Sequence, residues 1–397
     1  MTTIRNQEIN TILVLGGDGY IGWPLAMRLA RLHPKSEITI VDNLSRRKWV
    51  AESDSDSLTP IGLPLDRVEQ ARAILGVTNL QFVELDVSEP SIDDLVRRRK
   101  PDLIYHLSQQ ASAGYSMSGP EQSITTAVNN ETANLRLLWA IRRHVPECHL
   151  VKLGSFGEYC HFGLDIAEGF FEPTYNSKKA PRPAPYPRAA DDIYHVSKIN
   201  DSNYISMACR KWGLKVTEVM QSTVFGLMTE EIRKSPTLAT RFDYDTNYGT
   251  VMNRFTVQAA LSLPLTVYGT GWQRTGLMAL EDAVVSLASM ATDKMQLGQH
   301  RIINHVGETD LCIRDIADAV SKVAISQGLE VRVSCGESDP RTEQTPAKES
   351  YLIETPWLTT QGFKKTPLDQ VIRETLGVVK DLKGRIKSEV LAPARPW

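Results

Sequence analysis

Three glycines at three-residue spacing, Gly16, Gly19 and Gly22, constrain the fold of this chain more than any other feature. They follow a short apolar run at 11–15, which is typical of a buried parallel strand, and they precede helical spacing over 21–32. The chain must therefore turn sharply from a strand into a helix, and the N–H groups at the start of that helix favour a negatively charged group. This order predicts the first unit of a doubly wound α/β fold with a parallel sheet.

The first half of the chain continues the alternation of strands and helices. Further predicted strands lie at 37–41, 80–85, 102–107, 149–153 and 216–220, and a long helical stretch covers about 122–143. We expect a Rossmann-type domain over 1–222. The regular alternation of strands and helices ends after residue 220. We therefore expect 223–397 to form mostly a smaller C-terminal substrate-binding lobe, with some segments returning to the Rossmann domain. The proline-dense residues 178–187 predict a loop.

The composition is that of an ordinary globular protein and argues against several classes of partner. The chain has 42% hydrophobic and 23% charged residues and a net charge of -2. Without a basic stripe we expect no nucleic-acid partner, and no apolar run approaches the ~20 residues that span a membrane. Five scattered cysteines without CxxC spacing support neither a metal site nor a disulfide framework. Residues 1–10 do not resemble a signal peptide, so we expect a cytoplasmic protein.

The residue at the end of the second predicted strand indicates which anionic ligand binds at the glycine turn. Asp42 stands there, about twenty residues after Gly22, where a carboxylate accepts hydrogen bonds from the adenosine ribose and repels a 2′-phosphate. We therefore predict a dinucleotide site that prefers NAD to NADP. Arg46 and Arg47 lie close by in the sequence and favour NADP instead, since arginine can bind a 2′-phosphate. Asp42 as a plain turn residue, and the glycines as a plain tight turn, are the alternatives.

A tyrosine and a lysine at helical spacing, Tyr194 and Lys198, form YxxxK. A lysine ammonium lowers the pKa of a nearby phenol, so that tyrosinate acts as a base near neutral pH. Ser155 follows the preceding predicted strand and is placed to hydrogen-bond the substrate hydroxyl that Tyr194 deprotonates. The pair alone also fits an ordinary surface contact. The three residues together after a Rossmann start favour a catalytic site.

These motifs resemble the extended short-chain dehydrogenase/reductases, on GGDGYIG, the acid after the second strand, Asp86-Val87, Ser155 and YHVSK. A narrower resemblance is to the UDP-sulfoquinovose synthases. It rests on the runs GGDGYIGW, VDNLSRR, SLTPI, CHLVKLGSFGEY, YHVSK, RFDYD, YGTVMNRFTVQAA and PLTVYGTG, from residue 16 to about 270.

The resemblance implies an enzyme that uses NAD, and it implies the residues that bind NAD and substrate. The implied NAD-binding residues are Gly16, Gly19, Tyr20, Ile21, Gly22, Asp42, Asn43, Arg46, Asp86, Val87, Leu107, Lys198 and Gln221. The implied substrate-binding residues are Gln109, Phe156, Arg241, Thr250, Asn253, Arg254, Val267, Gln273, Arg274 and Arg341. Extended members commonly pair through two long helices, so we expect a homodimer, with stretches near 122–143 and 192–211 as candidates.

The resemblance also implies a reaction on a sugar. A hexose hydroxyl at carbon 4 is oxidised, and the ketone makes the hydrogen on carbon 5 acidic. Loss of that proton expels the carbon 6 hydroxyl and leaves an exocyclic alkene. Tyr194 is the expected base of the oxidation, Glu158 the group for proton abstraction or hydroxyl expulsion, and His195 its acid partner. A solvated Glu158 and a packed His195 are the alternatives.

Departures from the resemblance decide which reaction we favour. Ala111 stands where the pattern has an arginine, Arg274 is displaced by one position, Ala279 replaces an aspartate, and Phe156 replaces a methionine. We therefore favour a dehydratase that forms the alkene on a sugar, nucleotide sugar or nucleoside, adds no sulfur, and works in secondary metabolism. The alternatives are a true UDP-sulfoquinovose synthase, a nucleotide-sugar 4-epimerase and a non-catalytic NAD-binding sensor.

Overall fold

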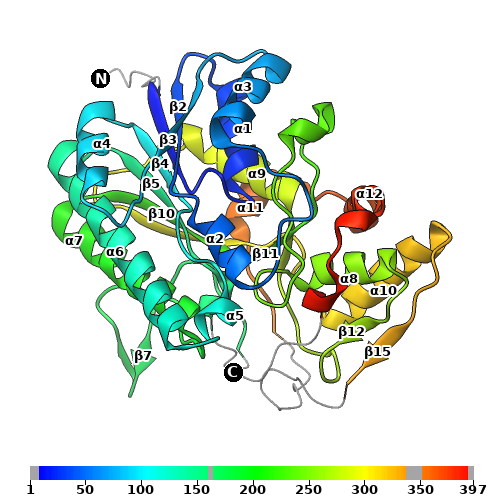
Figure 1. Cartoon of the computed structure of the whole chain (residues 1–397). Helices are drawn as coiled ribbons and strands as arrows, with labels where there is room; N and C mark the ends of the chain where they lie inside the picture. The colour runs from blue at the N-terminus through cyan, green and yellow to red at the C-terminus, as the bar shows by residue number, and fades with distance from the viewer. Residues whose placement is uncertain (1–8, 160–163, 337–350, 392–397) are drawn as a thin grey trace.

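The apolar run before the glycines forms β1 (Thr11–Leu15), which is buried on both faces of a central sheet (Figure 1). Ile12 and Val14 belong to one hydrophobic cluster and Leu13 and Leu15 to another, so the run is apolar throughout because both faces of the sheet are covered. The computed structural model describes residues 9–159, 164–336 and 351–391.

The central sheet has seven strands in the order β14-β10-β5-β4-β1-β2-β3, and each pair is parallel. Its other strands are β2 (Glu37–Asp42), β3 (Leu80–Glu84), β4 (Leu103–His106), β5 (His149–Leu153), β10 (Lys215–Gln221) and β14 (His300–His305). The predicted Rossmann-type doubly wound sheet is confirmed. Since β1 lies between β2 and β4, the strand order reverses there, and the carboxyl ends of these strands frame the crevice where such sheets bind ligands.

Helices cover both faces of the sheet. Hydrophobic side chains of α1 and α9 pack on one face, and those of α4, α6 and α7 pack on the other (Figure 1). The helices are α1 (Gly22–Leu32), α2 (Ser45–Glu52), α3 (Pro64–Leu75), α4 (Ser91–Arg99), α5 (Ala113–Ser116), α6 (Pro120–His144), α7 (Ile193–Trp212), α8 (Val251–Ala260), α9 (Leu280–Ser289), α10 (Ile313–Ser326), α11 (Pro356–Thr360) and α12 (Leu368–Asp381).

Helices α8, α10 and α12 pack around a second hydrophobic cluster that includes Phe255, Ile316 and Leu376. Two small parallel strand pairs accompany them. These are β11 (Thr223–Phe225) with β13 (Leu277–Ala279), and β12 (Leu265–Val267) with β15 (Val333–Cys335). Strand β14 lies within the second half of the chain but belongs to the central sheet. The second half thus supplies both a separate lobe and one edge of the sheet.

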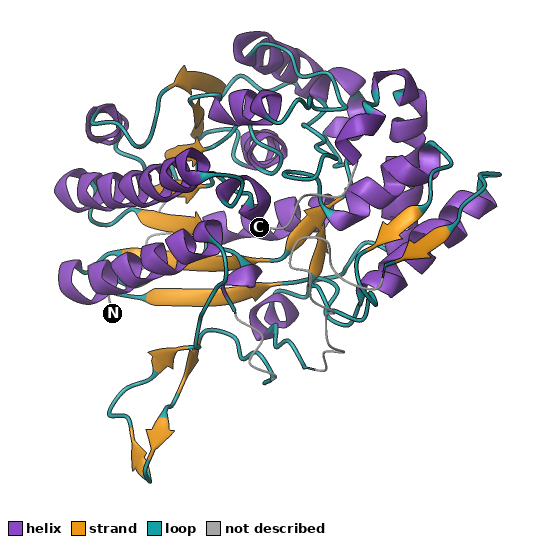
Figure 2. Ribbon diagram, turned by 60° about the horizontal axis from the view of Figure 1, so that its bottom comes forward, coloured by secondary structure: helices purple, strands orange, loops and turns teal. Residues whose placement is uncertain are grey.

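A narrow antiparallel ribbon projects from the body of the protein between β5 and α7 (Figure 2). It consists of the pairs β6 (Phe170–Phe171) with β9 (Ala184–Pro185) and β7 (Thr174–Tyr175) with β8 (Lys178–Lys179). The prediction that 178–187 is only a loop is therefore wrong for β8 and β9. Each of these strands has only two residues, and proline is tolerated at an exposed edge that donates no ladder hydrogen bond.

Within the part of the chain that the structure describes, no helix combines the length and the apolar character that crossing a membrane requires.

Candidate active site

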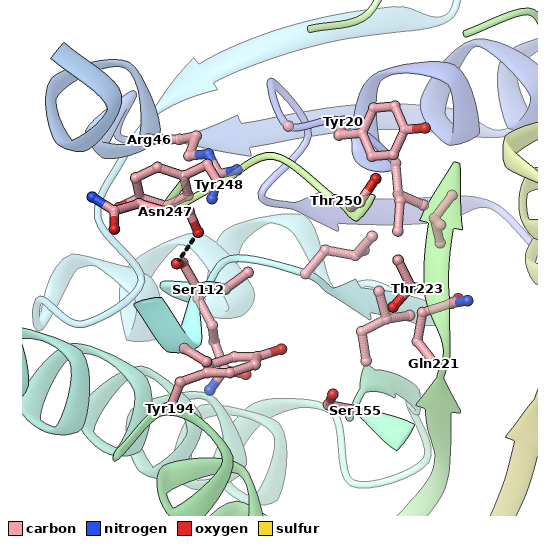
Figure 3. A pocket seen from close by; sticks show the side chains of 18 of the residues that line it. Tyr20, Arg46, Ser112, Ser155, Tyr194, Gln221, Thr223, Asn247, Tyr248 and Thr250 are labelled. Carbon is pink, nitrogen blue, oxygen red and sulfur yellow. Dashed lines mark hydrogen bonds between the residues drawn. The ribbon is translucent and has the colours of Figure 1, made fainter. Parts of the chain in front are cut away.

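A cavity of about 650 Å³ opens at the carboxyl ends of the central strands and reaches residues of the second lobe (Figure 3). Every residue predicted to bind NAD lines it. Four predicted catalytic residues line it as well, namely Ser155, Tyr194, His195 and Lys198. The predicted substrate residues that line it are Gln109, Arg241, Thr250, Arg254, Gln273 and Arg274. The fold therefore brings residues more than 200 positions apart into one site.

The glycine turn leaves no room for side chains. Gly16 has a φ of +79°, and a Cβ there would lie 2.6 Å from the carbonyl carbon of Leu107. A Cβ on Gly22 would lie 2.2 Å from the carbonyl oxygen of Gly16. Glycine is required at both positions because backbone occupies the space. Gly19, Tyr20, Ile21 and Gly22 line the cavity at the start of α1, and this cradle fits the pyrophosphate of a dinucleotide.

The carboxylate of Asp42 is fixed at the end of β2 by two backbone N–H groups. Asp18 donates to Oδ2 at 2.9 Å and Leu44 donates to Oδ1 at 2.7 Å. Burial, together with the charge of Asp18, raises the pKa of Asp42 to about 6. The carboxylate is thus placed for the hydroxyls of an adenosine ribose.

Both arginines near Asp42 are already engaged with other carboxylates. The Arg46 guanidinium donates to Asp243 at 2.8 Å and lies 3.7 Å from the ring centroid of Tyr248. Arg47 donates to Asp18 at 2.8 Å through both Nε and Nη2. Neither guanidinium is left to clamp a 2′-phosphate, so the structure favours NAD over NADP at this end of the cavity.

Ser155, Tyr194 and His195 meet at the catalytic end of the cavity. The Nε2 atom of His195 lies 3.0 Å from the Ser155 hydroxyl, and the rings of Tyr194 and His195 are 4.6 Å apart between centroids. Figure 3 shows the phenol of Tyr194 and the side chain of Ser155 in the same part of the pocket. Burial raises the pKa of Tyr194, whereas a hydrogen bond with Ser155 lowers it. The net lowering that we expected from Lys198 is therefore not seen.

Lys198 is held beneath this group by hydrogen bonds. Its ammonium donates to Gln109 Oε1 at 2.5 Å and to the carbonyl oxygen of Leu153 at 2.8 Å. The Gln109 amide then donates to Asp201 at 2.6 Å, and Asp201 pairs with the buried Lys152 at 3.2 Å. Burial, together with the charge of Lys152, lowers the pKa of Lys198 to about 7. Gln109, predicted as a substrate residue, thus joins Lys198 to a buried ion pair.

Glu158 does not reach the cavity, so the prediction that it acts on the substrate is not supported. Its side chain is fully buried, and its carboxylate accepts hydrogen bonds from Ser155 N at 2.8 Å and from Arg188 Nη1 at 2.8 Å. The physical reason is a capping box, in which the acid three positions after Ser155 folds back on the turn. The spacing Ser-x-x-Glu was the sequence signal for this structural role.

Three other predicted substrate residues also lie away from the cavity lining. Phe156 packs edge-on against Tyr159 at 5.3 Å between centroids. Asn253 is buried and donates to the carbonyl oxygen of Asp243 at 3.2 Å, and Val267 is buried in the lobe. Arg341 lies outside the described residues.

The lobe side of the cavity is rich in arginine. Arg254 Nη1 donates to the Tyr268 hydroxyl at 2.7 Å, whereas its Nε is buried without a hydrogen bond to any described residue. Arg274 pairs with Asp310 at 2.7 Å, and Arg241 pairs with Asp243 at 3.0 Å. These three cations suit an anionic ligand.

Sequence reasoning named Arg241 and Thr250 within residues 240–250, but it missed the contacts of this segment with the sheet domain. The carbonyl oxygen of Asn247 accepts from Ser112, as Figure 3 shows, and the Asn247 amide donates to Ser53 at 2.9 Å. Thr59 donates to the carbonyl oxygen of Thr240 at 2.6 Å. No local sequence pattern predicts these contacts, because the contacting residues are far apart in the sequence.

Comparison with known proteins identifies the family. The sequence model of the NAD dependent epimerase/dehydratase family matches residues 12–305. The chain belongs to the NAD-dependent epimerase/dehydratase family. NAD is therefore its cofactor, and the predicted membership of the extended short-chain dehydrogenase/reductases is confirmed. Among the described residues no group of three or more His, Cys, Asp or Glu is arranged to hold a metal ion.

Two curated relatives match nearly the whole of this chain. The UDP-sulfoquinovose synthase of Sulfolobus acidocaldarius is 38% identical, and the match covers 97% of each chain. The chloroplastic UDP-sulfoquinovose synthase of Spinacia oleracea is 35% identical over 97% of this chain and 79% of its own. The fold also resembles the UDP-glucose 4-epimerase of Thermotoga maritima, with a TM-score of 0.64, 17% identity and coverage of 94% and 99%. A dTDP-glucose 4,6-dehydratase of Bacillus anthracis, in complex with NAD, gives a TM-score of 0.64 at 15% identity, with coverage of 96% and 100%.

The predictions of a homodimer, a cytoplasmic location and a role in secondary metabolism stay predictions.

Proposed function

We propose that this protein is a nucleotide-sugar dehydratase that oxidises a hexose hydroxyl, eliminates water to form an exocyclic alkene, and then restores the hydroxyl. One observation carries the proposal. Two groups able to exchange protons, Tyr194 and His195, meet at Ser155, where His195 Nε2 is 3.0 Å from the serine oxygen. A 4-epimerase needs a proton carrier only at the oxidised hydroxyl, whereas an elimination needs a second one.

Different residues of this chain would bind the cofactor and transfer the proton during the oxidation. The glycine turn would hold the NAD pyrophosphate, Asp42 the adenosine ribose, and Lys198 the nicotinamide ribose. When bound, NAD takes up the hydride of the hexose and supplies it again at the end of the cycle. Tyr194 takes the proton of the hydroxyl as the ketone forms and returns it on reduction. The charged Lys198, 5.6 Å from the centroid of the Tyr194 ring, stabilises the phenolate.

His195 carries the proton of the elimination. The ketone makes the hydrogen on the neighbouring carbon acidic, and Nε2 of His195 takes that proton. The electron pair of the broken C–H bond forms the alkene, and the hydroxyl on the next carbon departs with the proton from His195 as water. Among the described residues that line the cavity, the carboxylates are Asp42 and Asp86, both at the other end. One histidine must therefore act as base and then as acid.

The arginines of the lobe support a nucleoside diphosphate sugar as the substrate. Arg254, Arg241 and Arg274 line the cavity. Guanidinium groups are the natural clamp for the oxygens of a diphosphate. The two curated relatives carry the name of a UDP-sugar enzyme.

A second candidate, a true UDP-sulfoquinovose synthase, is favoured by the 38% and 35% identity to two such enzymes over 97% of this chain. In that reaction a sulfur nucleophile adds to the alkene before the hydride returns. Against it stands Ala111, which lines the cavity at the position where the resemblance has an arginine. The wall there lacks a cation that an anionic nucleophile would use.

Mass spectrometry of the products separates the two. The purified protein with NAD is incubated with UDP-glucose and with hexose-bearing nucleosides, each with and without sulfite. We expect loss of one water from the substrate whether or not sulfite is present. Gain of a sulfonate would establish the synthase instead. A product of unchanged mass that NMR identifies as the 4-epimer would refute both.

A further inference from the structure

Asp192, at the start of α7, makes two separate contacts with the same histidine. Its Oδ1 accepts a hydrogen bond from the backbone N–H of His195 at 2.9 Å, which caps the helix. Its Oδ2 lies 2.6 Å from Nδ1 of the His195 ring. A helix cap requires only one acceptor oxygen. The second oxygen is therefore available to act on the ring.

The second contact decides where the proton of the neutral imidazole sits. A carboxylate can only accept, so Nδ1 of His195 carries the proton, and Nε2 keeps its lone pair. The Ser155 hydroxyl, 3.0 Å from Nε2, then donates to that lone pair. The side chains form a chain of donors and acceptors in the order Ser155, His195, Asp192. In the neutral ring, Nε2, the atom proposed to take the substrate proton, thus carries the lone pair and lies beside Ser155, which lines the cavity.

The shape of the turn beside His195 gives an independent observation. A Cβ on Gly157 would lie 2.3 Å from Nε2 and 2.8 Å from Cε1 of the His195 ring. The ring therefore occupies the space that any other residue at 157 would need. Gly157 lies in the short helix η1 (Phe156–Glu158) that follows Ser155. The turn that presents Ser155 is thus built to admit this imidazole.

We propose that Asp192 is a positioning residue that prepares His195 for the elimination, by fixing the proton on Nδ1 and by balancing the charge of the imidazolium formed when Nε2 takes a proton. The inference rests on the proposed function and deepens it. Only 11% of the Asp192 side chain and 18% of the His195 side chain are exposed, so solvent screens this pair less than a surface ion pair. Asp192 itself does not line the cavity.

The substitution Asp192→Asn separates the two contacts. Asparagine caps helices as well as aspartate does, but it has one acceptor oxygen, and the helix N–H takes it. The amide nitrogen then donates to Nδ1, which moves the ring proton to Nε2. The matched control is Asp191→Asn, which removes the same charge from the exposed neighbouring residue. Asp192→Ser, which also keeps a cap, is a second variant.

Two measurements on the NAD-loaded full chain test the proposal. Nitrogen-15 NMR of labelled histidine reports which ring nitrogen of His195 bears the proton, with His195→Gln used for assignment. We expect the proton on Nδ1 in the wild type and in Asp191→Asn, and on Nε2 in Asp192→Asn. With UDP-glucose as the probe, we expect kcat of alkene formation to fall about 10- to 100-fold in Asp192→Asn, less than for loss of the acid–base group itself, while KM changes by less than about two-fold.

Two results would overturn the proposal. One is an unchanged Nδ1 proton in Asp192→Asn together with unchanged kcat, which would make Asp192 a helix cap only. The other is an equal loss of kcat in Asp191→Asn, which would show an effect of general charge. If the wild type forms no alkene from UDP-glucose, the proposed function fails for that substrate. The position of the ring proton then still decides the role of Asp192.

Discussion

Arg188 and Glu158 form a buried ion pair, with 2.8 Å between Arg188 Nη1 and Glu158 Oε2, behind the turn that carries Ser155. The same guanidinium nitrogen lies 3.0 Å from Glu218 Oε1. Their side chains are 6%, 0% and 0% exposed. The charges thus pair through one guanidinium nitrogen away from the cavity, and they support the catalytic turn from behind.

The substitution Glu158→Gln should cost stability and spare the chemistry. It removes one charge from a hydrogen-bonded pair, and we expect the free energy of unfolding to fall by about 2 kcal/mol. The effect of Arg188→Met should be larger, about 3–5 kcal/mol, because two buried carboxylates lose their cation. Urea unfolding and kcat of each variant are the measurements. A large loss of kcat in Glu158→Gln at unchanged stability would restore Glu158 as a reacting group.

Removal of the Tyr194 hydroxyl should abolish turnover and leave the cofactor site intact. Tyr194→Phe keeps the ring and loses the atom that exchanges the proton of the substrate hydroxyl, so we expect kcat to fall about 10²- to 10⁴-fold. NAD content, measured by absorbance after release from the purified protein, should stay unchanged. Full turnover in this variant would refute the role assigned to Tyr194 and revive the non-catalytic alternative.

The buried pair of Lys152 and Asp201 should set the pH range of activity. The charge of Lys152 lowers the pKa of Lys198 and that of Asp201 raises it. Since a charged Lys198 is needed, activity should be lost as the pH rises through the pKa of Lys198. Lys152→Met should move the alkaline fall in kcat to higher pH, and Asp201→Asn should move it to lower pH. Shifts in the same direction in both variants would contradict this account.

The same lysine should leave a signature in stability. Burial lowers the pKa of Lys198 from 10.5 to about 7. Between these two values the unfolded chain binds more protons at this position than the folded protein does. The contribution of Lys198 to the free energy of unfolding therefore rises with pH across this window. Urea unfolding at pH 7, 8 and 9 should show a steeper rise in the wild type than in Lys198→Met.

Cofactor choice should depend on Asp42 more than on the arginines beside it. Asp42→Asn keeps an acceptor for the backbone and removes the charge that repels a 2′-phosphate. We expect the preference for NAD over NADP to shrink at least about ten-fold, since facing like charges cost several kcal/mol. Titration of cofactor into the wild type and the variant measures it. A preference that stays unchanged in Asp42→Asn, and disappears when Arg46 is replaced, would reverse the assignment.

The fold and the cofactor half of the site follow from local sequence patterns. Apolar runs, the glycine turn and Asp42 are set within about 30 residues of one another, and each has a direct physical reading. The YxxxK helix and the serine turn are equally local. These patterns predicted the glycines and Asp42 at the cofactor end of the cavity. Other residues that line this end, such as Leu107 and Gln221, were implied only by the family resemblance.

The remaining features depend on contacts between distant residues. The resemblance implied a reacting role for Glu158, but Glu158 is held away from the cavity partly by Arg188, 30 positions later, and this ion pair leaves no local sign in the sequence. The bridge from Gln109 to Asp201 spans 92 positions, and the contact of Asn247 with Ser112 spans 135. Asp192 is only three residues from His195. The sequence can indicate that Asp192 caps the helix, but it does not show that Oδ2 of Asp192 also faces the His195 ring.

Strand β14 has a consequence for any attempt to divide this protein. It pairs with β10 from Val216–His300 to Gln221–His305, and His305 Nδ1 lies 2.7 Å from the Oε1 of Gln221, a cavity residue. The central sheet is therefore complete only after residues 300–305 have been synthesised. Truncation of the chain at a single position cannot yield the catalytic half as a separate domain with an intact sheet. A transplant of that half must carry residues 11–221 together with 300–305.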